Sequence, residues 1–252
     1  MAKACVMLDM DDVPHLSEEQ KATILGGVPP WQRASRKSGI PGMGAGAIYP
    51  IPEHQMLIDP FPIPDHWPRS YGLDVGWNCT AAIWFAWDID NGGAVAYAEY
   101  YKGLADPSVH VAAINRISGN GNIENGRWLP GVIDPAAEKV HGLAGEILLD
   151  VYRDLGLNVA KADNAVVPGL VKTWDMLTTR QLRVFNTLRN WRNEVRLYRR
   201  DEKGNIIKKA DHLMDATRYN VMSGRAVALV PPTHVSQGIP WFNWTPPEVW
   251  SG

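Results

Sequence analysis

The sequence lacks the features of a disulfide-bonded, secreted or membrane-spanning protein. Its only cysteines, Cys5 and Cys79, lie far apart and form no CxxC motif, so neither a disulfide framework nor a zinc site is expected. No segment approaches the roughly 18 consecutive apolar residues of a membrane span. The acidic start MAKACVMLDMDD does not resemble a secretion signal. These absences predict a soluble protein of a reducing cytoplasm.

The chain also lacks a strong net charge and any internal repeat. Its 25 basic and 27 acidic residues give a formal charge of −2, so a nucleic-acid surface would have to be a local patch. Of its 252 residues, 45% are hydrophobic, which is enough to bury one substantial core. We therefore expect one globular domain.

Proline and glycine are concentrated toward the two ends of the chain. Residues 1–69 contain GGVPPWQR, GIPGMGAGAIYPIPEH and DPFPIPDHWPR, and the one helix expected there spans 17–25, with Ser17 as its cap. The tail VPPTHVSQGIPWFNWTPPEVWSG has too many prolines for regular structure. The sequence thus predicts an N-terminal arm over 1–69, a core over 70–224 and a Pro/Trp-rich tail over 225–252.

The core has two kinds of hydrophobic pattern. It opens with β-type runs over 70–77, 80–87 and 94–101, and 88–93 is typical of a hairpin turn. Helical and strand patterns then alternate. Helices are expected over 106–118, 145–156, 170–177 and 211–222, and strands over 128–134, 157–160 and 181–185. An antiparallel meander followed by α/β units predicts an α/β protein with a mixed sheet flanked by helices, the order of a ribonuclease H-like core.

Three segments carry acidic residues at positions where hydrophobic pattern alone would not place a carboxylate. Asp74 lies inside the apolar strand YGLDVGW, and Asp134 ends the strand WLPGVID just before Pro135, where active-site residues of α/β proteins commonly lie. In the helix DHLMDATRY, Asp211 and His212 share one face with Asp215. Several hard oxygen ligands are what Mg²⁺ and Mn²⁺ require. The three segments together predict a metal site.

Each acid also has an ordinary structural interpretation. A strand Asp can cap a turn, and an Asp before Pro often begins a loop. Asp211 could simply cap the helix that it begins, because a carboxylate at this position accepts hydrogen bonds from the first backbone amides. Asp215 lies one turn further in, too late to cap.

The sequence resembles the C-terminal nuclease domain of phage large terminase subunits. The resemblance covers nearly the whole chain, through DVPHLSEEQ, GIPGMGAGAIYPIPE, YGLDVGWNCTAAIW, VIDPAA, YRDLGLNV, ADNAVVPGL and RLYRRDEKGNIIKKADHLMDATRYNVMSG. It implies that Asp74, Asp134 and Asp215 are the catalytic metal ligands, with His212 beside the metal. Whether Asp211 is a further ligand or a cap stays open.

The resemblance implies a magnesium- or manganese-dependent endonuclease with two ions, which cuts concatemeric duplex DNA during genome packaging with little sequence preference. No segment resembles the phosphate-binding motif GxxxxGK[ST] of an ATPase. We therefore expect the nuclease part of a longer subunit, or a split or excised version of it. The implied partners are duplex DNA, an ATPase motor region, the portal and the small terminase subunit, in the host cytoplasm and without a membrane.

The segment 181–209 is the predicted DNA contact. It holds nine Lys or Arg residues against three acids, interleaved with Trp191 and Tyr198. Alternatively it is an exposed amphipathic hairpin whose arginines pair with Glu194, Asp201 and Glu202. The eleven tryptophans are expected to pack in the core and the arm, except for Trp77 beside the first acid. The candidate DNA-binding residues are Arg189, Arg192, Arg196, Arg199, Arg200, Lys203, Lys208 and Lys209.

Two other functions compete with this interpretation. The acids could hold a structural cation in a non-catalytic docking module of the packaging motor, which predicts metal binding without cleavage. A Holliday-junction resolvase shares the same core but would act on branched DNA.

Overall fold

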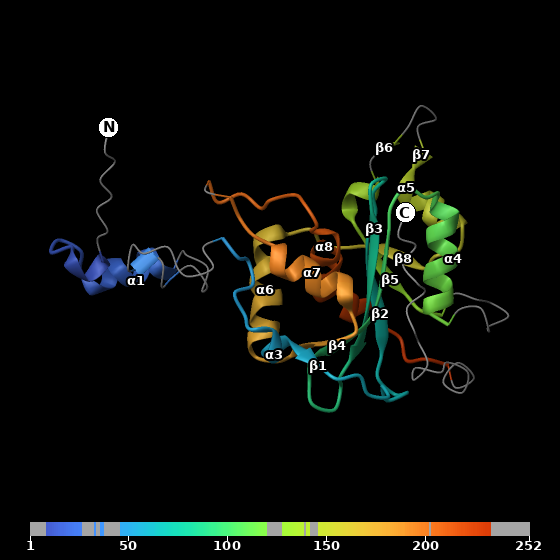
Figure 1. The fold of residues 1–252 in the computed structure, drawn as a ribbon, viewed down its shortest axis with the longest axis horizontal. Coiled ribbons are helices and arrows are strands. Elements are labelled where there is room, and N and C mark those ends of the chain that lie inside the picture. The colour runs from blue at the N-terminus through green and yellow to red at the C-terminus, as the bar shows by residue number, and fades with distance from the viewer. Residues whose placement is uncertain are drawn as a thin grey trace.

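The computed structural model describes residues 9–26, 33, 36–37, 46–119, 128–138, 140–141, 146–201 and 203–232. Their main feature is a seven-stranded mixed sheet with helices on both faces (Figure 1). None of the helices within these residues is long and apolar enough to span a membrane. Most of the expected tail, 233–252, lies outside the described residues, so the division into arm, core and tail stays a prediction.

The sheet begins as an antiparallel meander and is extended by parallel strands on both sides. The meander is β2 (Arg69–Asp74), β3 (Thr80–Trp87) and β4 (Ala94–Lys102). On one side of the meander, β5 (Gly131–Ile133) and β8 (Val159–Lys161) follow in parallel. On the other side, β9 (Leu182–Phe185) and β1 (Leu57–Ile58) do the same, giving the order β1-β9-β4-β3-β2-β5-β8. This confirms the expected α/β class and mixed sheet. A separate two-stranded sheet holds β6 (Val140–His141) and β7 (Glu146–Ile147).

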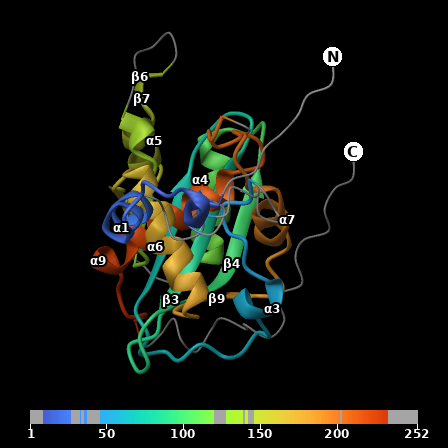
Figure 2. The same cartoon turned by 90° about the vertical axis from the view of Figure 1, so that its left-hand side faces the viewer.

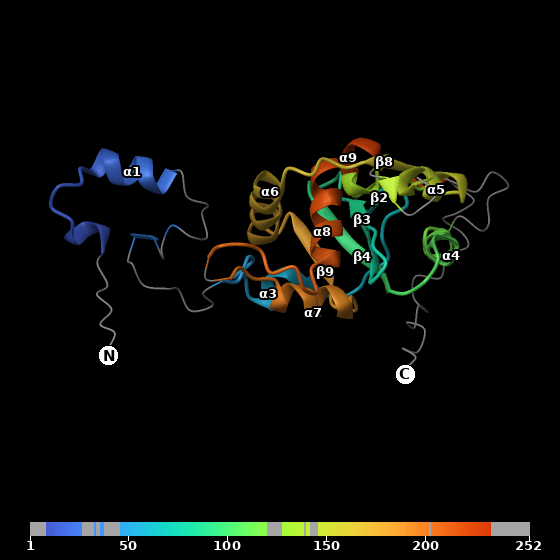
Figure 3. The same cartoon turned by 90° about the horizontal axis from the view of Figure 1, so that it is seen from above.

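The helices cover the two faces of the sheet in two groups. In Figures 1 and 3, α6 (Val166–Thr178), α7 (Arg189–Leu197) and α8 (His212–Tyr219) lie on one face, whereas α4 (Pro107–Ile117) and α5 (Leu148–Asp154) lie on the other. Figure 2 views the molecule from the side of α6, which lies in front of the sheet. The other helices described are α1 (Glu18–Gly26), α3 (Glu53–Met56) and α9 (Arg225–Val227), with short 3₁₀ helices η1 (Met10–Asp12) and η3 (Pro135–Glu138) and a π-helix, η4 (Asn220–Gly224).

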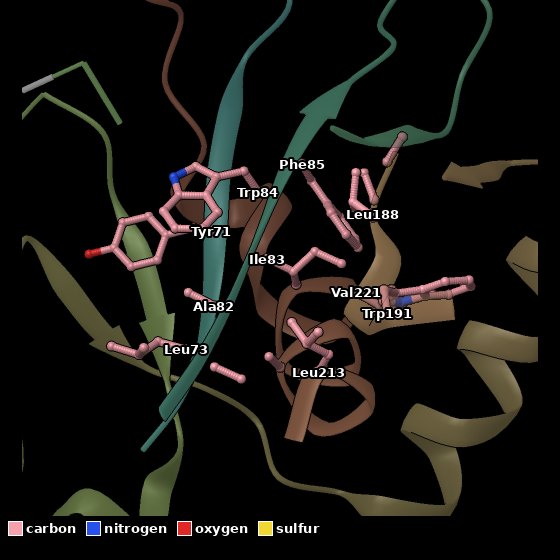
Figure 4. Packing of buried hydrophobic residues seen from close by; sticks show 14 of the residues in the cluster. Tyr71, Leu73, Ala82, Ile83, Trp84, Phe85, Leu188, Trp191, Leu213 and Val221 are labelled. Carbon is pink, nitrogen blue, oxygen red and sulfur yellow. The ribbon is translucent and has the colours of Figure 1, made fainter. Parts of the chain in front are cut away.

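The central strand β3 explains why the sheet needs helices on both faces. All eight of its residues are buried, because side chains alternate between the two faces of a strand and both faces are covered. In Figure 4, Ile83 and Phe85 point toward α7 and α8, and Trp84 points the other way, toward Tyr71. The rings of Tyr71 and Trp84 lie 5.7 Å apart. Burial of these side chains contributes about 1.5–3 kcal/mol each.

Local sequence signals predicted several element boundaries. The side-chain oxygen of Ser17 accepts from the Gln20 amide and the Gln20 side chain accepts from the Ser17 amide, which is a capping box that begins α1. The hairpin between β3 and β4 turns through Gly92 and Gly93 with positive φ. Two strands are shorter than expected: β2 ends at Asp74 rather than at 77, and β5 spans only 131–133.

Part of the expected N-terminal arm is built into the domain. Within 46–69, Ile48, Met56 and Trp67 are buried in the core, and β1 pairs in parallel with β9. By contrast, α1 buries no residue and lies apart from the sheet (Figures 1 and 3).

Candidate metal centre

Asp74 and Asp134 lie side by side because two parallel strands end together. Leu73 pairs with Ile133 in the register of β2 and β5, and each acid is the next residue along its strand. The Asp134 amide donates to the Leu73 carbonyl at 2.9 Å. The side chain of Asp134 accepts from the Ala136 amide at 2.9 Å, which fixes the turn after β5. The strand register therefore brings the first two predicted ligands to one edge of the sheet.

The third acid reaches this edge because α8 packs unusually close to β2. Gly72 makes the approach possible: a Cβ there would lie 2.1 Å from the Ala216 carbonyl oxygen and 2.9 Å from the Asn220 Cβ. No residue but glycine fits at such a distance without moving the helix. The side chains of Trp191 and Thr217 hold α8 against α7 through a 3.0 Å hydrogen bond. Asp215 and His212 are thereby placed beside the strand ends.

Two positively charged side chains bind the Asp215 carboxylate. One oxygen accepts from the Arg218 guanidinium at 3.0 and 3.3 Å, and the other accepts from the Lys208 ammonium at 2.9 Å. Arg218 is fully buried and also donates to the Asn164 side chain at 2.9 Å. Partial burial acts to lower the pKa of Lys208, but the negative charges of Asp215 and Asp211 outweigh it. The pKa of Lys208 therefore lies above its ordinary value. Asp215 is thus a buried carboxylate with strong charge compensation.

Asp211 belongs to the same charged group and does not cap the helix. Lys208 Nζ lies 3.0 Å from Asp211 Oδ2, an ion pair that lacks hydrogen-bond geometry. The Asp211 side chain accepts no capping bond from α8. Of the two roles left open for Asp211, the side-chain cap is therefore wrong: the capping side chain is Glu194 of α7, whose buried carboxylate accepts from the amides of Leu213 and Met214 at 2.6 and 3.3 Å.

Glu194 continues a chain of buried carboxylates that set the helices in place. Glu99 of β4 accepts from the backbone amides of Asn190 and Trp191, both at 2.8 Å, and so caps α7. Burial raises the pKa of Glu99 and raises that of Glu194 to about 7. The start of α8, which carries the candidate ligands, is therefore fixed to the sheet through α7.

His212 contacts the first acid directly. Its Nδ1 lies 2.9 Å from Asp74 Oδ2, and this hydrogen bond raises the pKa of His212. The ring of Tyr101 meets the ring of His212 edge to face, with centroids 6.2 Å apart. His212 is therefore oriented between a carboxylate and an aromatic ring.

The electrostatics show that the three acids influence one another. Burial raises the pKa of Asp74 to about 6, the hydrogen bond from His212 lowers it, and the charges of Asp215 and Asp134 raise it. Burial also raises the pKa of Tyr219, and the same three carboxylates add to that effect. Like charges gathered in this way destabilise the site unless cations neutralise them.

The side chains as they stand are not yet a closed ligand set. Within the described part of the chain, no three His, Cys, Asp or Glu side chains are grouped tightly enough to hold one ion. Asp215 is turned toward Lys208 and Arg218, and Asp74 toward His212. Carboxylates and an imidazole at one sheet edge nevertheless make a donor set that fits Mg²⁺ or Mn²⁺.

The predicted DNA-binding residues are distributed over α7 and the segment that follows it. Arg192 and Arg196 pair with Glu53 of α3, and the Arg200 guanidinium donates to the Gly204 carbonyl at 2.8 Å. Lys208 belongs to the acid group. Of the arginine partners expected in the alternative interpretation, Glu194 is buried and caps α8, Asp201 accepts from the amides of Lys203 and Asn205, and Glu202 lies outside the described residues. The exposed residues of the set are Arg189, Arg196, Arg199, Lys203, Lys208 and Lys209.

Sequence reasoning missed two contributors to the site. Arg218 lies three residues after Asp215, and this helical spacing could have indicated the ion pair. Glu194 gave no such signal, because its partners are backbone amides of another helix.

Comparisons with known proteins identify relatives of the chain among phage packaging proteins. No known protein-family model matches the chain. The large terminase subunit of Salmonella phage P22 is 32% identical over 229 residues, covering 87% of this chain and 44% of that protein. The large terminase subunit of Enterobacteria phage LP7 is 32% identical over 226 residues, covering 86% and 46%. The chain spans less than half the length of these relatives.

Solved structures point to one part of such subunits. The P22 large terminase nuclease domain superposes with a TM-score of 0.65 at 29% identity, covering 74% of this chain and 95% of that structure. The large terminase of a thermophilic bacteriophage, solved in complex with ADP, has the same fold at 22% identity, with a TM-score of 0.60 and coverage of 85% and 54%. The chain belongs to the family of phage large terminase nuclease domains, which have a ribonuclease H-like fold.

Proposed function

We propose that this chain is a divalent-metal-dependent endonuclease that cuts concatemeric duplex DNA during viral genome packaging. The observation that carries the proposal is the convergence of Asp74, Asp134 and Asp215 at one edge of the sheet, where each influences the same ionisable groups. Membership of the terminase nuclease family supports the same activity.

The donor set supports Mg²⁺ or Mn²⁺ as the cofactor. Asp74, Asp134 and Asp215 are the proposed ligands, with His212 and Asp211 beside them, because hard cations prefer carboxylate oxygens. Two such ions would activate water and stabilise the leaving 3′ oxygen during phosphodiester hydrolysis.

The residues of the chain have separate tasks in this reaction. Arg218 fixes one Asp215 oxygen and leaves the other to Lys208. Lys208 is two-thirds exposed, so it is free to move away as the carboxylates turn toward a cation. His212 orients the Asp74 carboxylate through its 2.9 Å hydrogen bond. Glu194 keeps the whole helix start in register with the strand ends.

DNA contacts are assigned to the basic segment 181–209, through phosphates rather than bases. Such contacts carry little sequence information, which suits an enzyme that cuts wherever packaging stops. We infer that an ATPase motor region, the portal and the small subunit act with this domain in the host cytoplasm. This inference is supported by the length of the relatives, more than half of which lies outside the match.

The direct test is plasmid nicking with purified protein. Supercoiled DNA should be nicked or linearised with Mg²⁺ or Mn²⁺ and should stay intact in EDTA, because the carboxylates alone supply no Lewis acid. Cleavage in excess chelator would exclude the metal mechanism. Metal binding by calorimetry without any cleavage would support the docking module instead.

A branched substrate separates the remaining alternative. A four-way junction and a linear duplex of equal length should be cut at similar rates by a packaging nuclease. Strong preference for the junction would assign the chain to the resolvases.

A further inference from the structure

An exposed apolar pair projects beside the acids. Trp77 is 68% exposed and lies three residues after Asp74, in the loop between β2 and β3. Leu104 is 71% exposed and lies just beyond the end of β4. Strands β3 and β4 pair Thr80 with Lys102, so both loops leave the sheet at one end. We call Trp77 and Leu104 the prong.

The backbone holds the prong in a defined position. The Leu104 amide donates to the Trp77 carbonyl at 2.9 Å, and the Thr80 hydroxyl donates to the Gly76 carbonyl at 3.2 Å. A Cβ at Gly103 would lie 2.0 Å from the Asn78 carbonyl oxygen, so the two loops touch. Leu104 has a φ of +51°, a conformation that is unfavourable for a branched side chain. Two large apolar side chains are thus presented to solvent, Leu104 at a cost in backbone strain.

The prong is joined to the candidate metal centre through β4. Tyr101, 38% exposed, lies three residues before Leu104, and its ring contacts His212, which in turn bonds Asp74. Exposed Lys102 follows Tyr101 directly. Exposed apolar residues with a polar rim commonly mark a binding surface. Here the rim combines a lysine with the acids proposed to hold divalent cations, so the fitting occupant is a polyanion with apolar faces.

We propose that the prong binds DNA by packing against the sugar and base faces of nucleotides next to the phosphate being cut. This rests on the proposed nuclease function, which places DNA at the acids. In an intact duplex the base faces are covered by their neighbours, so the prong packs against sugar rings or enters between bases at a kinked step. Every sequence offers such contacts, so the prong adds affinity without sequence preference. It complements the phosphate contacts of segment 181–209.

The test measures duplex affinity in EDTA over a range of salt concentrations, for wild type, Trp77→Ala, Trp77→Phe, Leu104→Ala and a control, Ile89→Ala. Ile89 is 48% exposed but lies in the hairpin at the opposite end of β3. Trp77→Ala should raise Kd about fivefold or more, Leu104→Ala should raise it less, and Trp77→Phe should restore most of the loss. The slope of log Kd against log salt should stay that of wild type, because no phosphate contact is lost.

Two results would overturn the proposal. An unchanged Kd for Trp77→Ala would assign the prong to a protein surface, and a salt slope that flattens would show that the loss is electrostatic. The binding assay does not depend on cleavage. If the wild-type protein binds DNA through the prong but does not cut it with Mn²⁺, only the proposed nuclease function is refuted. Melting temperatures close to wild type for all variants verify that they are folded.

Discussion

At the scale of single residues, the negative charges of the site's carboxylates are compensated by positively charged side chains of the same protein. Lys208 bridges Asp211 and Asp215 at 3.0 and 2.9 Å, and so neutralises two groups that a divalent ion would also seek. Arg218 is buried behind Asp215 and cannot leave without exposing an unpaired charge. We therefore propose that Lys208 is the cation that a bound metal would displace.

Replacing Lys208 tests this competition. Lys208→Met should increase the affinity for Mn²⁺ about two- to tenfold, because a positive charge is removed and the acids lose a competing partner. The effect is modest since Lys208 is two-thirds exposed and solvent screens it. Titration calorimetry measures it, with exposed Lys203→Met as the matched control. Weaker binding in Lys208→Met would show that the lysine supports the metal rather than opposing it.

Glu194, and not Asp211, supplies the side-chain cap of α8. Glu194→Ala should lower the free energy of unfolding by about 1–3 kcal/mol, because the Leu213 and Met214 amides lose their buried acceptor. Asp211→Ala should cost less than about 1 kcal/mol, since it removes no capping bond. Urea denaturation of both variants compares them. A larger loss for Asp211→Ala would contradict the assignment of the cap.

At the scale of elements, the close contact between α8 and β2 determines whether Asp215 lies at the same edge of the sheet as Asp74 and Asp134. Gly72→Ala places a methyl group 2.1 Å from a backbone oxygen, so α8 must shift away. We expect a loss of about 2 kcal/mol or more in stability and loss of metal binding, because Asp215 moves with the helix. Gly26→Ala in α1, where nothing lies within 4 Å, is the control. Metal affinity unchanged in Gly72→Ala would refute the positioning role.

Helices and strands that are marked by local hydrophobic pattern and turn residues were predictable from the sequence. Contacts between these elements were not. The runs that became β3 and β4, and Asp134 at the end of its strand, follow from hydrophobic pattern and turn residues. Trp77 was expected inside the first strand, but β2 ends at Asp74 because the chain must turn there to bring β3 back. The Glu194 cap and the Lys208 bridge join segments through tertiary packing, which no period in the sequence reveals.

At the scale of the whole molecule, the proposed function requires that DNA reach both the acids and the exposed basic residues that follow α7. Replacing Arg199, Lys203 and Lys209 by Ala should weaken binding to all duplexes alike. It should also flatten the dependence of log affinity on log salt by about two to three units, because each phosphate contact contributes about 0.9. Binding isotherms at several salt concentrations measure this. The control replaces Arg116 and Arg153, which lie on helices of the opposite face of the sheet. If the salt slope falls equally in the test and control variants, segment 181–209 does not contact the DNA.

The central claim is that three carboxylates, delivered by β2, β5 and α8, hold the metal that cuts DNA. The most direct measurement is plasmid nicking with Mn²⁺ by Asp74→Asn, Asp134→Asn and Asp215→Asn, beside the exposed control Asp106→Asn. An amide keeps the shape of the side chain but removes the charge that holds the cation. The account predicts that the first three variants stay folded and lose cleavage while the control cuts like wild type. Wild-type cleavage by a folded Asp74→Asn variant would contradict it.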